Sequence, residues 1–306
     1  MAPPRPEAFL LVALLVPMPG AAQQVADTAF RPVIPATTHP FGRGPVVAVD
    51  EAHQNFHTIA GRFGPFAALL ERDGYRVVPS RLPFDSASLA SLGLLVVANA
   101  VAAENATRWI RPILPAFTDA EVRAVRAWVE RGGALLLIAD HMPFGEAAAG
   151  LGRAFGFDLL GGFALDTSGA DLAAFSRMAG TLADHPVTRG RSGEERVEQV
   201  RSFTGQAVRV PPEATPLLLL PEGTVSLFPD TAWQFSARTR QAPAGGLAQG
   251  AVRRYGQGRI AVFGEAAMFT AQLAGPTRAP VGMNAPGATG NATLVLNLVR
   301  WLLEPT

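Results

Sequence analysis

The sequence contains no cysteine. This absence excludes a thiol nucleophile, a thiolate metal site and any disulfide bridge, so the fold must be stabilised by its core. The chain has 306 residues and 48% of them are hydrophobic, which is enough to bury a substantial interior. We therefore expect a globular protein with one large domain.

Lysine is absent as well, because all 26 basic residues are arginine. They are balanced by 25 acidic residues, which leaves a formal net charge of +1, and they are scattered along the chain. Such a pattern offers no concentrated positive field to a phosphate backbone or an anionic membrane surface. The sequence therefore excludes nucleic acid as an expected partner.

Long hydrophobic runs are missing after the N-terminus. The apolar run Phe9–Val16 is followed by small residues at Gly20–Ala22, and it falls short of the ~20 residues that a spanning helix needs. The pattern is typical of a secretory signal peptide, predicted over residues 1–22 with cleavage after Ala22. We expect a periplasmic or secreted protein that keeps no transmembrane anchor after cleavage.

Several catalytic and cofactor motifs are also absent from the sequence. There is no Gly-x-Ser-x-Gly nucleophile elbow, no Walker loop and no dinucleotide fingerprint after the first predicted strand. No nucleotide cofactor is therefore expected.

The sequence from Pro45 onward predicts a repeating α/β pattern. Residues 23–44 are rich in proline, threonine and glycine and predict an extended N-terminal linker, whereas 45–306 form a single domain. Apolar runs without alternation indicate strands buried on both faces. This pattern predicts a doubly wound, mainly parallel, flavodoxin-like sheet. The predicted strands are Pro45–Val49, Tyr75–Val78, Leu92–Val97 and Ala134–Ile138, and helices are predicted around 59–70, 118–129 and 147–155.

The second half of the domain is less regular. Residues 161–250 contain short apolar pieces separated by proline and glycine, which predicts an irregular, more β-rich section. Regular structure is expected again with a tight turn at Gly256–Gly258, a strand at Arg259–Phe263 and a closing amphipathic helix at Asn291–Leu303.

Polar residues are dense directly after the first predicted strand. Asp50, His53, Asn55 and His57 all fall within eight residues, and we interpret them as substrate-binding candidates. The two histidines have the i,i+4 spacing of zinc ligands if a helix begins early, but the full metalloprotease helix motif is absent, so a divalent metal stays an open possibility. The alternative is that these side chains cap the following helix and brace the loop.

A second polar position follows the strand that ends at Ile138. Asp140 and His141 must emerge at the carboxyl edge of the sheet, where ligands bind in open parallel sheets. A carboxylate that orients an imidazole can activate water, or the pair can bind a cation, so both residues are catalytic candidates. The alternative is that Asp140 braces the turn and His141 bonds a carbonyl.

A third polar position follows the strand Arg259–Phe263. Glu265 supplies a second carboxylate and is the third catalytic candidate, while Asn284 in a later loop is a substrate-binding candidate. Asn291 is expected to cap the last helix. His185 lies in the irregular section, where a role in a turn is expected.

Two stretches resemble a known superfamily. The residues Asp-Glu-Ala-His-Gln-Asn-Phe-His at 50–57 and Gly-Glu-Ala-Ala-Met-Phe at 264–269 resemble an uncharacterised bacterial branch of the class I glutamine amidotransferase-like superfamily. The resemblance covers Pro45 to the C-terminus and implies a flavodoxin-like sheet. Asp140 and His141 stand where members of that superfamily carry a cysteine nucleophile. Because this chain has no cysteine and no late His-Pro-Glu, glutamine amidotransferase activity does not carry over.

Two functions follow from these observations. The first is an exported, hydrolase-like protein in which His141 acts as base or ligand, Asp140 and Glu265 orient it or share a cation, and His53 and Asp50 complete the pocket. The second is a non-catalytic domain that binds a carbohydrate or another small molecule in a degenerate amidotransferase-like pocket. Convergence of the polar residues in one cleft would favour the first.

Overall fold

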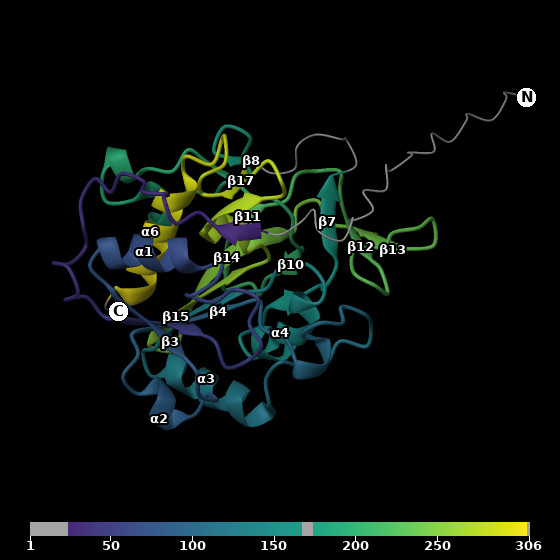
Figure 1. Cartoon of the computed structure of the whole chain (residues 1–306), viewed down its shortest axis with the longest axis horizontal. Helices are drawn as coiled ribbons and strands as arrows, with labels where there is room; N and C mark the ends of the chain where they lie inside the picture. Colours follow the sequence, from purple (N-terminus) through teal and green to yellow (C-terminus); the bar gives the residue numbers. More distant parts are fainter. Residues whose placement is uncertain (1–23, 167–173, 305–306) are drawn as a thin grey trace, which may run out of the picture.

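A computed structural model describes residues 24–166 and 174–304 of the chain. The predicted signal peptide lies outside these residues. Within them, no helix combines the length and the apolar character that a membrane span requires. The chain folds around a nine-stranded central sheet that is covered by helices on both faces (Figure 1).

One half of the central sheet is parallel. Its strands lie in the order β3-β2-β4-β5-β15, and each neighbouring pair is parallel. Counted in chain order this is 2-1-3-4-5, the flavodoxin-like order, in which ligands bind where the winding reverses, here between β2 and β4. The strands are β2 (Val46–Asp50), β3 (Arg76–Ser80), β4 (Leu94–Ala98), β5 (Ala134–Ile138) and β15 (Gly258–Phe263).

The other half of the sheet is antiparallel, so the sheet as a whole is mixed and the prediction of a mainly parallel sheet needs correction. The turn at Gly256 joins two strands directly, and a tight hairpin can only pair its strands antiparallel. The strands of this half are β14 (Ala248–Tyr255), β11 (Thr215–Leu219), β10 (Val208–Arg209) and β6 (Asp158–Leu159).

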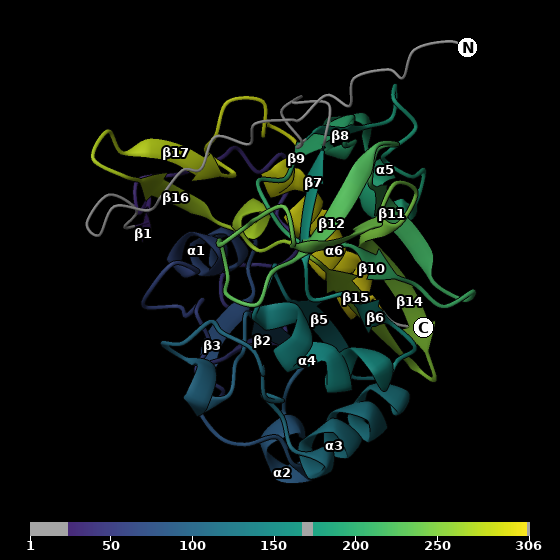
Figure 2. The ribbon, with the colours of Figure 1, turned by 90° about the vertical axis from the view of Figure 1, so that its right-hand side faces the viewer.

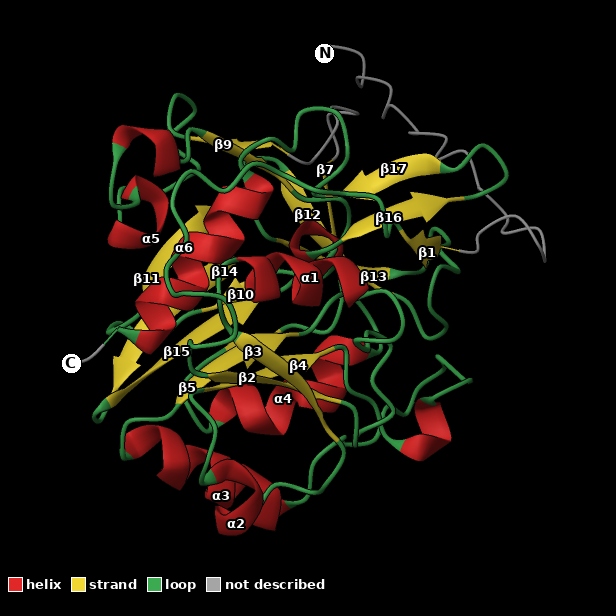
Figure 3. Cartoon of the chain, turned by 60° about the vertical axis from the view of Figure 1, so that its left-hand side comes forward, coloured by secondary structure: helices red, strands yellow, loops and turns green. Residues whose placement is uncertain are grey.

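Two hydrophobic cores lie on opposite faces of the sheet. In β4, Leu94 and Val96 belong to one core and Leu95 and Val97 to the other, which explains why this strand shows no alternation of apolar and polar residues. Figure 3 shows helices packed on each face of the sheet. The first face carries α1 (Gly64–Arg72) and α6 (Asn291–Leu303), and the second carries α2 (Ser86–Leu89), α3 (Asp119–Glu130) and α4 (Phe144–Arg153).

Helix α3 begins at a capping box formed by Thr118 and Glu121. The Thr118 side chain accepts from the main-chain N–H of Glu121, and the Glu121 carboxylate accepts from the main-chain N–H of Thr118. The helix ends at Glu130, and Gly132 follows with a φ of 114°, a conformation that favours glycine. These local signals place α3 and the following β5 as the sequence predicts.

The section between Gly161 and Gly250 consists largely of short strands. A three-stranded sheet in the order β13-β12-β7 projects from one side of the molecule (Figure 1), and a pair of strands lies near α5 (Figure 2). His185 begins α5, because its Nδ1 accepts from the main-chain N–H of Val187. The elements are β7 (Phe163–Asp166), β8 (Ala174–Ser176), α5 (Pro186–Arg189), η2 (Gly193–Glu195), β9 (Gln199–Arg201), β12 (Thr224–Phe228) and β13 (Arg240–Pro243), and η1 (Ala103–Asn105) lies earlier in the chain.

The N-terminal segment packs on the domain and is not a free linker. Its strand β1 (Gln24–Ala26) pairs with β16 (Ala271–Ala274), which pairs in turn with β17 (Ala279–Gly282) (Figure 2). Farther along, Thr38 donates from its main chain and its hydroxyl to the buried carboxylate of Asp73. After β1 the segment consists of turns, bends and irregular chain, and the carbonyl oxygen of Pro32 accepts from Arg72 of α1.

Candidate functional site

A cleft of ≈ 550 Å³ lies beyond the carboxyl ends of the parallel strands. It is found at the reversal between β2 and β4, where the loops after neighbouring strands diverge. Its walls also include residues of β1, β16 and β17. The polar residues on which the argument rests are His57, Arg62, Asn99, Asp140, His141 and Gln272.

Asn99 joins the loops that follow three neighbouring strands. It stands directly after β4 with a φ of 52°, a left-handed conformation that asparagine tolerates better than most residues. Its Oδ1 accepts from the main-chain N–H of Asp140 at 2.9 Å, and its Nδ2 donates to Nδ1 of His57 at 3.1 Å. Asn99 is not among the residues predicted from the sequence, although its position after a buried strand is the same signal that identified Asp50 and Asp140.

His57 is a neutral hydrogen-bond donor in this cleft. Because its Nδ1 accepts from Asn99, its Nε2 carries the proton. Burial, together with the charges of Arg62 and His141, lowers the pKa of His57 to about 3. The ring therefore stays uncharged at neutral pH, and its Nε2–H can donate to a ligand but cannot accept from it.

His141 is held in the opposite tautomer. Its Nδ1 lies 2.7 Å from the carbonyl oxygen of Met142, and since a carbonyl can only accept, Nδ1 carries the proton. Nε2 has a free lone pair and no hydrogen-bond partner within 24–166 and 174–304. The ring stacks on Phe163 at 4.5 Å between centroids and meets the edge of Trp233 at 4.7 Å, which fixes its orientation.

Asp140 does not orient the His141 ring, contrary to the predicted pairing. Its Oδ1 accepts from the main-chain N–H of His141 at 2.8 Å, because the turn after β5 folds the carboxylate back onto its own backbone. The turn is fixed by Gln206, which is fully buried and donates to the carbonyl oxygens of Ala139 and Asp140 at 2.7 and 2.9 Å. Asp140 itself lines the cleft and brings a carboxylate into it.

Glu265 lies beside Asp140 but does not line the cleft. Its two carboxylate oxygens accept from the main-chain N–H groups of Ala267 and Met268, each at 2.8 Å, and so begin the short helix η3 (Ala267–Phe269). Burial, with the negative charge of Asp140, raises the pKa of Glu265 well above its ordinary value. The structure gives this predicted catalytic residue a supporting position behind the cleft.

His53 belongs to a buried ion triad away from the cleft. Its Nδ1 lies 2.9 Å from both carboxylate oxygens of Asp50, and its Nε2 lies 2.8 Å from Oε1 of Glu121. The ring is packed between Phe84 and Phe117 at centroid distances of 4.6 and 4.7 Å. The predicted substrate-binding residues Asp50 and His53 therefore use their polar atoms on one another and on helix α3.

Electrostatics within the triad favour its charged form. Burial lowers the pKa of His53, but the hydrogen bonds and charges of Asp50 and Glu121 outweigh it, so the pKa of His53 is raised. Burial raises the pKa of Glu121, but hydrogen bonds from Thr118 and His53 outweigh it and bring the pKa to about 2. The triad has the features of a structural ion cluster.

The predicted zinc spacing is not realised. The segment that follows β2 forms turns and bends, and α1 begins only at Gly64, so His53 and His57 do not share a helical face. Their ring nitrogens bond to different partners, as given above. Across the described parts of the chain, no group of three or more histidine, aspartate or glutamate side chains is arranged to hold a metal ion.

The remaining predicted residues support the loops around the cleft. The Nδ2 of Asn55 donates to Asp50 at 3.0 Å and to the carbonyl oxygen of Ala98 at 3.3 Å. The Nδ2 of Asn284 donates to Asp27 and to the carbonyl oxygen of Gln272. Asn291 does not cap α6, since Gly290 precedes the helix and the Asn291 amide bonds to the main chain of other segments.

Aromatic side chains form much of the rest of the cleft. Phe56, Trp109, Phe144 and Trp233 all line it, and Trp109 meets Phe56 and Phe144 edge-on at 5.4 and 5.2 Å. The four come from separate loops and from the start of α4, so nothing in the local sequence groups them. The cleft therefore combines aromatic walls with a few placed polar groups, which is the usual composition of a small-molecule site.

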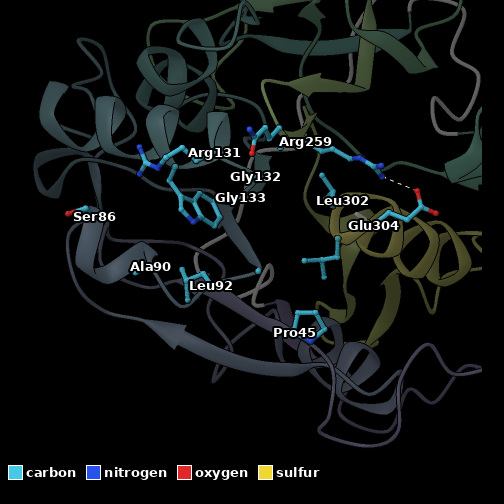
Figure 4. A pocket seen from close by; sticks show the side chains of 15 residues that line it. Pro45, Ser86, Ala90, Leu92, Arg131, Gly132, Gly133, Arg259, Leu302 and Glu304 are labelled. Carbon is cyan, nitrogen blue, oxygen red and sulfur yellow. Dashed lines mark hydrogen bonds and ion pairs between the residues drawn. The ribbon is translucent and has the colours of Figure 1, made fainter. Parts of the chain in front are cut away.

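A larger cavity of ≈ 700 Å³ lies at the opposite edge of the sheet (Figure 4). Its walls include Gly93, Gly132 and Gly133 before the amino ends of β4 and β5. Figure 4 shows Arg259 directed at Glu304, and the two form an ion pair at 3.0 Å. Arg259 also bonds the main chain of Trp301. Arg259 and Glu304 thus use their charges on one another and on the fold, and the carboxyl edge remains the better candidate site.

Comparisons with known proteins show similarity in the fold alone. Neither a protein-family model nor a curated protein sequence matches this chain. The solved structure "mmIFT52 N-terminal domain" overlays with a TM-score of 0.58 at 14% identity, over 84% of this chain and 97% of that one. This similarity supports the mixed α/β architecture described above.

Two other solved structures overlay with lower scores. A ThuA-like protein from Bacteroides uniformis has a TM-score of 0.47 at 13% identity, over 88% of this chain and 95% of that one. The β-galactosidase from Bacillus circulans has a TM-score of 0.44 at 8% identity, over 84% of this chain and 30% of that one.

Proposed function

We propose that this protein is an enzyme that acts on a small carbohydrate bound in the cleft, with His141 as the general base. The observation that carries the proposal is the tautomer of His141. Its Nδ1–H donates to the carbonyl oxygen of Met142, which leaves the Nε2 lone pair available in a cleft that a ligand can enter. This is the arrangement that a histidine base requires.

The walls of the cleft support a carbohydrate as ligand. The C–H faces of a sugar ring pack well against aromatic rings, and Trp109 and Trp233 line the cleft close to His141, at ring distances of 6.3 and 4.7 Å. Sugar hydroxyls need both donors and acceptors. His57 supplies a donor, Asp140 supplies acceptors, and Gln272 supplies one of each.

The supported chemistry is proton abstraction. Nε2 of His141 takes a proton from water or from a substrate hydroxyl group, and that oxygen forms a bond to an electrophilic carbon of the substrate. The bond from this carbon to its leaving group breaks, and the protonated His141 returns the proton to the leaving group. The imidazolium that forms is stabilised by the negative charge of Asp140 in the same cleft. Glycoside hydrolysis by two opposed carboxylates is not supported, because both oxygens of Glu265 are held by main-chain amides.

The proposal is tested by following a panel of mono- and disaccharides with the purified protein by NMR. His141→Ala should reduce turnover by about 100-fold or more, the usual contribution of a general base, with little change in the thermal midpoint. His185→Ala is the matched control, because His185 begins α5 and does not line the cleft, and it should retain full turnover. Turnover that survives in His141→Ala would refute the assignment.

A binding function without catalysis is the second candidate. It is favoured by the supporting position of Glu265, which leaves Asp140 as the acidic side chain that lines the cleft within the described residues. Saturable sugar binding without turnover would establish it.

For either function we propose that the mature protein acts after export. Protein purified from the periplasm or the medium should then have Gln23 as its first residue by N-terminal sequencing.

A further inference from the structure

Arg62 brings an unpaired positive charge into the cleft. Its guanidinium carbon lies 4.0 Å from the ring centre of Phe56, and its Nη1 reaches the Phe56 carbonyl oxygen at 3.5 Å. In the described parts of the chain no carboxylate forms an ion pair with it, and its buried Nε has no hydrogen-bond partner. A half-buried charge without a counter-ion is costly unless a ligand supplies one.

Gln272 brings a second unsatisfied group to the same cleft. It lies in β16, its side chain is fully buried, and within 24–166 and 174–304 neither its Nε2 nor its Oε1 has a hydrogen-bond partner. The residue is held in place by its main chain, which pairs with Ala26 of β1 and Val281 of β17. Buried polar groups in proteins almost always have partners, so an unpaired amide in a cleft wall indicates a polar ligand.

The side chains of Arg62 and Gln272 require different hydrogen-bonding atoms on that ligand. Arg62 can only donate, and its planar guanidinium matches the two oxygens of a carboxylate. Gln272 has one acceptor besides its donors, so it also needs a hydroxyl or amine hydrogen on the ligand. A phosphate group alone would leave that acceptor unpaired. A molecule with a carboxylate and a neighbouring hydroxyl satisfies both residues.

We propose that the natural ligand of this cleft is a sugar acid, whose carboxylate binds Arg62 and whose hydroxyl group bonds Gln272. This inference rests on the proposed carbohydrate function and makes its ligand more specific. His57 lines the same cleft as Arg62, and its Nε2–H is a further donor for that carboxylate. Asp140 and His141 are then left for the uncharged part of the sugar.

The inference is tested by isothermal titration of the full chain with matched probes. D-glucuronate, D-galacturonate and D-mannuronate are each compared with the corresponding neutral hexose and hexose 6-phosphate. The best uronate should bind about 10- to 100-fold more tightly than its hexose, the range expected for hydrogen bonds to a charged group. In Arg62→Met, which removes the charge but keeps a long unbranched side chain, the affinity for the uronate should fall to that for the hexose.

Gln272→Met separates recognition from folding. It should weaken uronate binding by about 10-fold and leave the thermal midpoint unchanged or higher, because removing a buried unpaired amide does not destabilise a protein. If Gln272 has only a structural role, Gln272→Met should instead lower the thermal midpoint and leave the affinity for the uronate unchanged. That result would overturn the assignment of Gln272.

The remaining outcomes distinguish the two proposals. If hexoses bind as tightly as uronates, or hexose phosphates bind more tightly, the sugar-acid inference is wrong while the carbohydrate proposal stands. If uronates are preferred but Arg62→Met keeps the preference, the role of Arg62 is wrong. If no sugar of any charge binds, both proposals fail.

Discussion

Two histidines four residues apart have opposite electrostatic environments in this protein. His53 places both ring nitrogens against the carboxylates of Asp50 and Glu121, and the pKa of His53 is raised. His57 bonds to the neutral amide of Asn99, and the pKa of His57 falls to about 3. Both ring nitrogens of His53 are bonded within the fold, whereas His57 keeps its Nε2–H as a donor for the cleft.

The comparison teaches that the partners of a polar residue, and not its type or spacing, decide whether it can serve a ligand. Both histidines lie in the segment that follows β2, and both are buried. In the triad both ring nitrogens of His53 are bonded to carboxylates, so the ring has no group left for a ligand. Around the cleft, by contrast, His57, His141 and Gln272 each keep at least one unused hydrogen-bonding group.

Replacing His53 should have the largest effect on stability. His53→Ala leaves two carboxylates buried without their cation, and we expect the free energy of unfolding to fall by about 3 to 5 kcal/mol. The matched variant His57→Gln removes one neutral hydrogen bond and should cost about 1 kcal/mol. Urea unfolding measures both. Equal losses in the two variants would remove the distinction between triad and cleft.

The pH dependence of stability should have opposite signs for the two histidines. His57 becomes protonated below pH 6.5 in the unfolded chain, whereas the folded protein keeps it neutral down to about pH 3. Its contribution to stability therefore falls by about 1.4 kcal/mol per pH unit as the pH drops through that range. Since the pKa of His53 is raised, its contribution is complete below pH 6.5 and is lost as the pH rises through that raised pKa.

These slopes are measured by urea unfolding at a series of pH values. Because the pKa of Glu121 is near 2 in the fold and ordinarily 4.5, Glu121 causes its own loss of stability below pH 4.5, and the His57 slope is best read between pH 6.5 and 4.5. His57→Gln should make the acid slope shallower but not abolish it, because burial also lowers the pKa of His185 to about 4 and that histidine contributes to the same slope. His53→Ala should flatten the alkaline slope. An acid slope unchanged in His57→Gln would contradict the buried neutral state.

Asp140→Asn should give the smallest effect, and one of unusual sign. The charge of Asp140 raises the pKa of Glu265, and an acid whose pKa is raised on folding reduces stability above its ordinary pKa of 4.5. Removing that charge should stabilise the fold at pH 7 by on the order of 1 kcal/mol while it impairs the cleft. The asparagine Oδ1 can still accept from the His141 main chain.

The exposed Asp158, which pairs with Arg209, provides the control for this variant, since Asp158→Asn should leave stability nearly unchanged. If Asp140→Asn instead lowers the free energy of unfolding, the Asp140 carboxylate stabilises the turn by more than its repulsion with Glu265 destabilises the fold.

The sequence predicts what local patterns determine. The Thr118 and Glu121 capping box, the apolar run of β5 and the glycine turn before β15 each act over a few residues, and all three are present in the structure. Asp140 and His141, predicted from their position after a strand end, line the cleft, and their catalytic role stays a prediction. What failed is the pairing between residues, such as the ring of His141 with Asp140.

Those pairings depend on contacts between distant segments. Glu121 lies 68 residues beyond His53, and its role in the capping box gives no sign that its second oxygen binds that histidine. Gln206 reaches the Asp140 turn from 66 residues away, and Gln272 enters the cleft from a strand added outside the main sheet. The antiparallel half of the sheet was missed for a similar reason, since β6 and β10 have only two residues each and irregular segments separate its strands along the chain.

Strand β1 has a practical consequence for anyone who trims this protein. Gln24 lines the cleft, and β1 covers one side of β16, the strand that carries Gln272. A truncated protein that begins at Pro45, the start of the first predicted strand, would lack part of the wall of the cleft. It would also leave β16 with an unpaired edge that is prone to association. Affinity handles are better fused after the last helix, whose end lies near the opposite edge of the sheet.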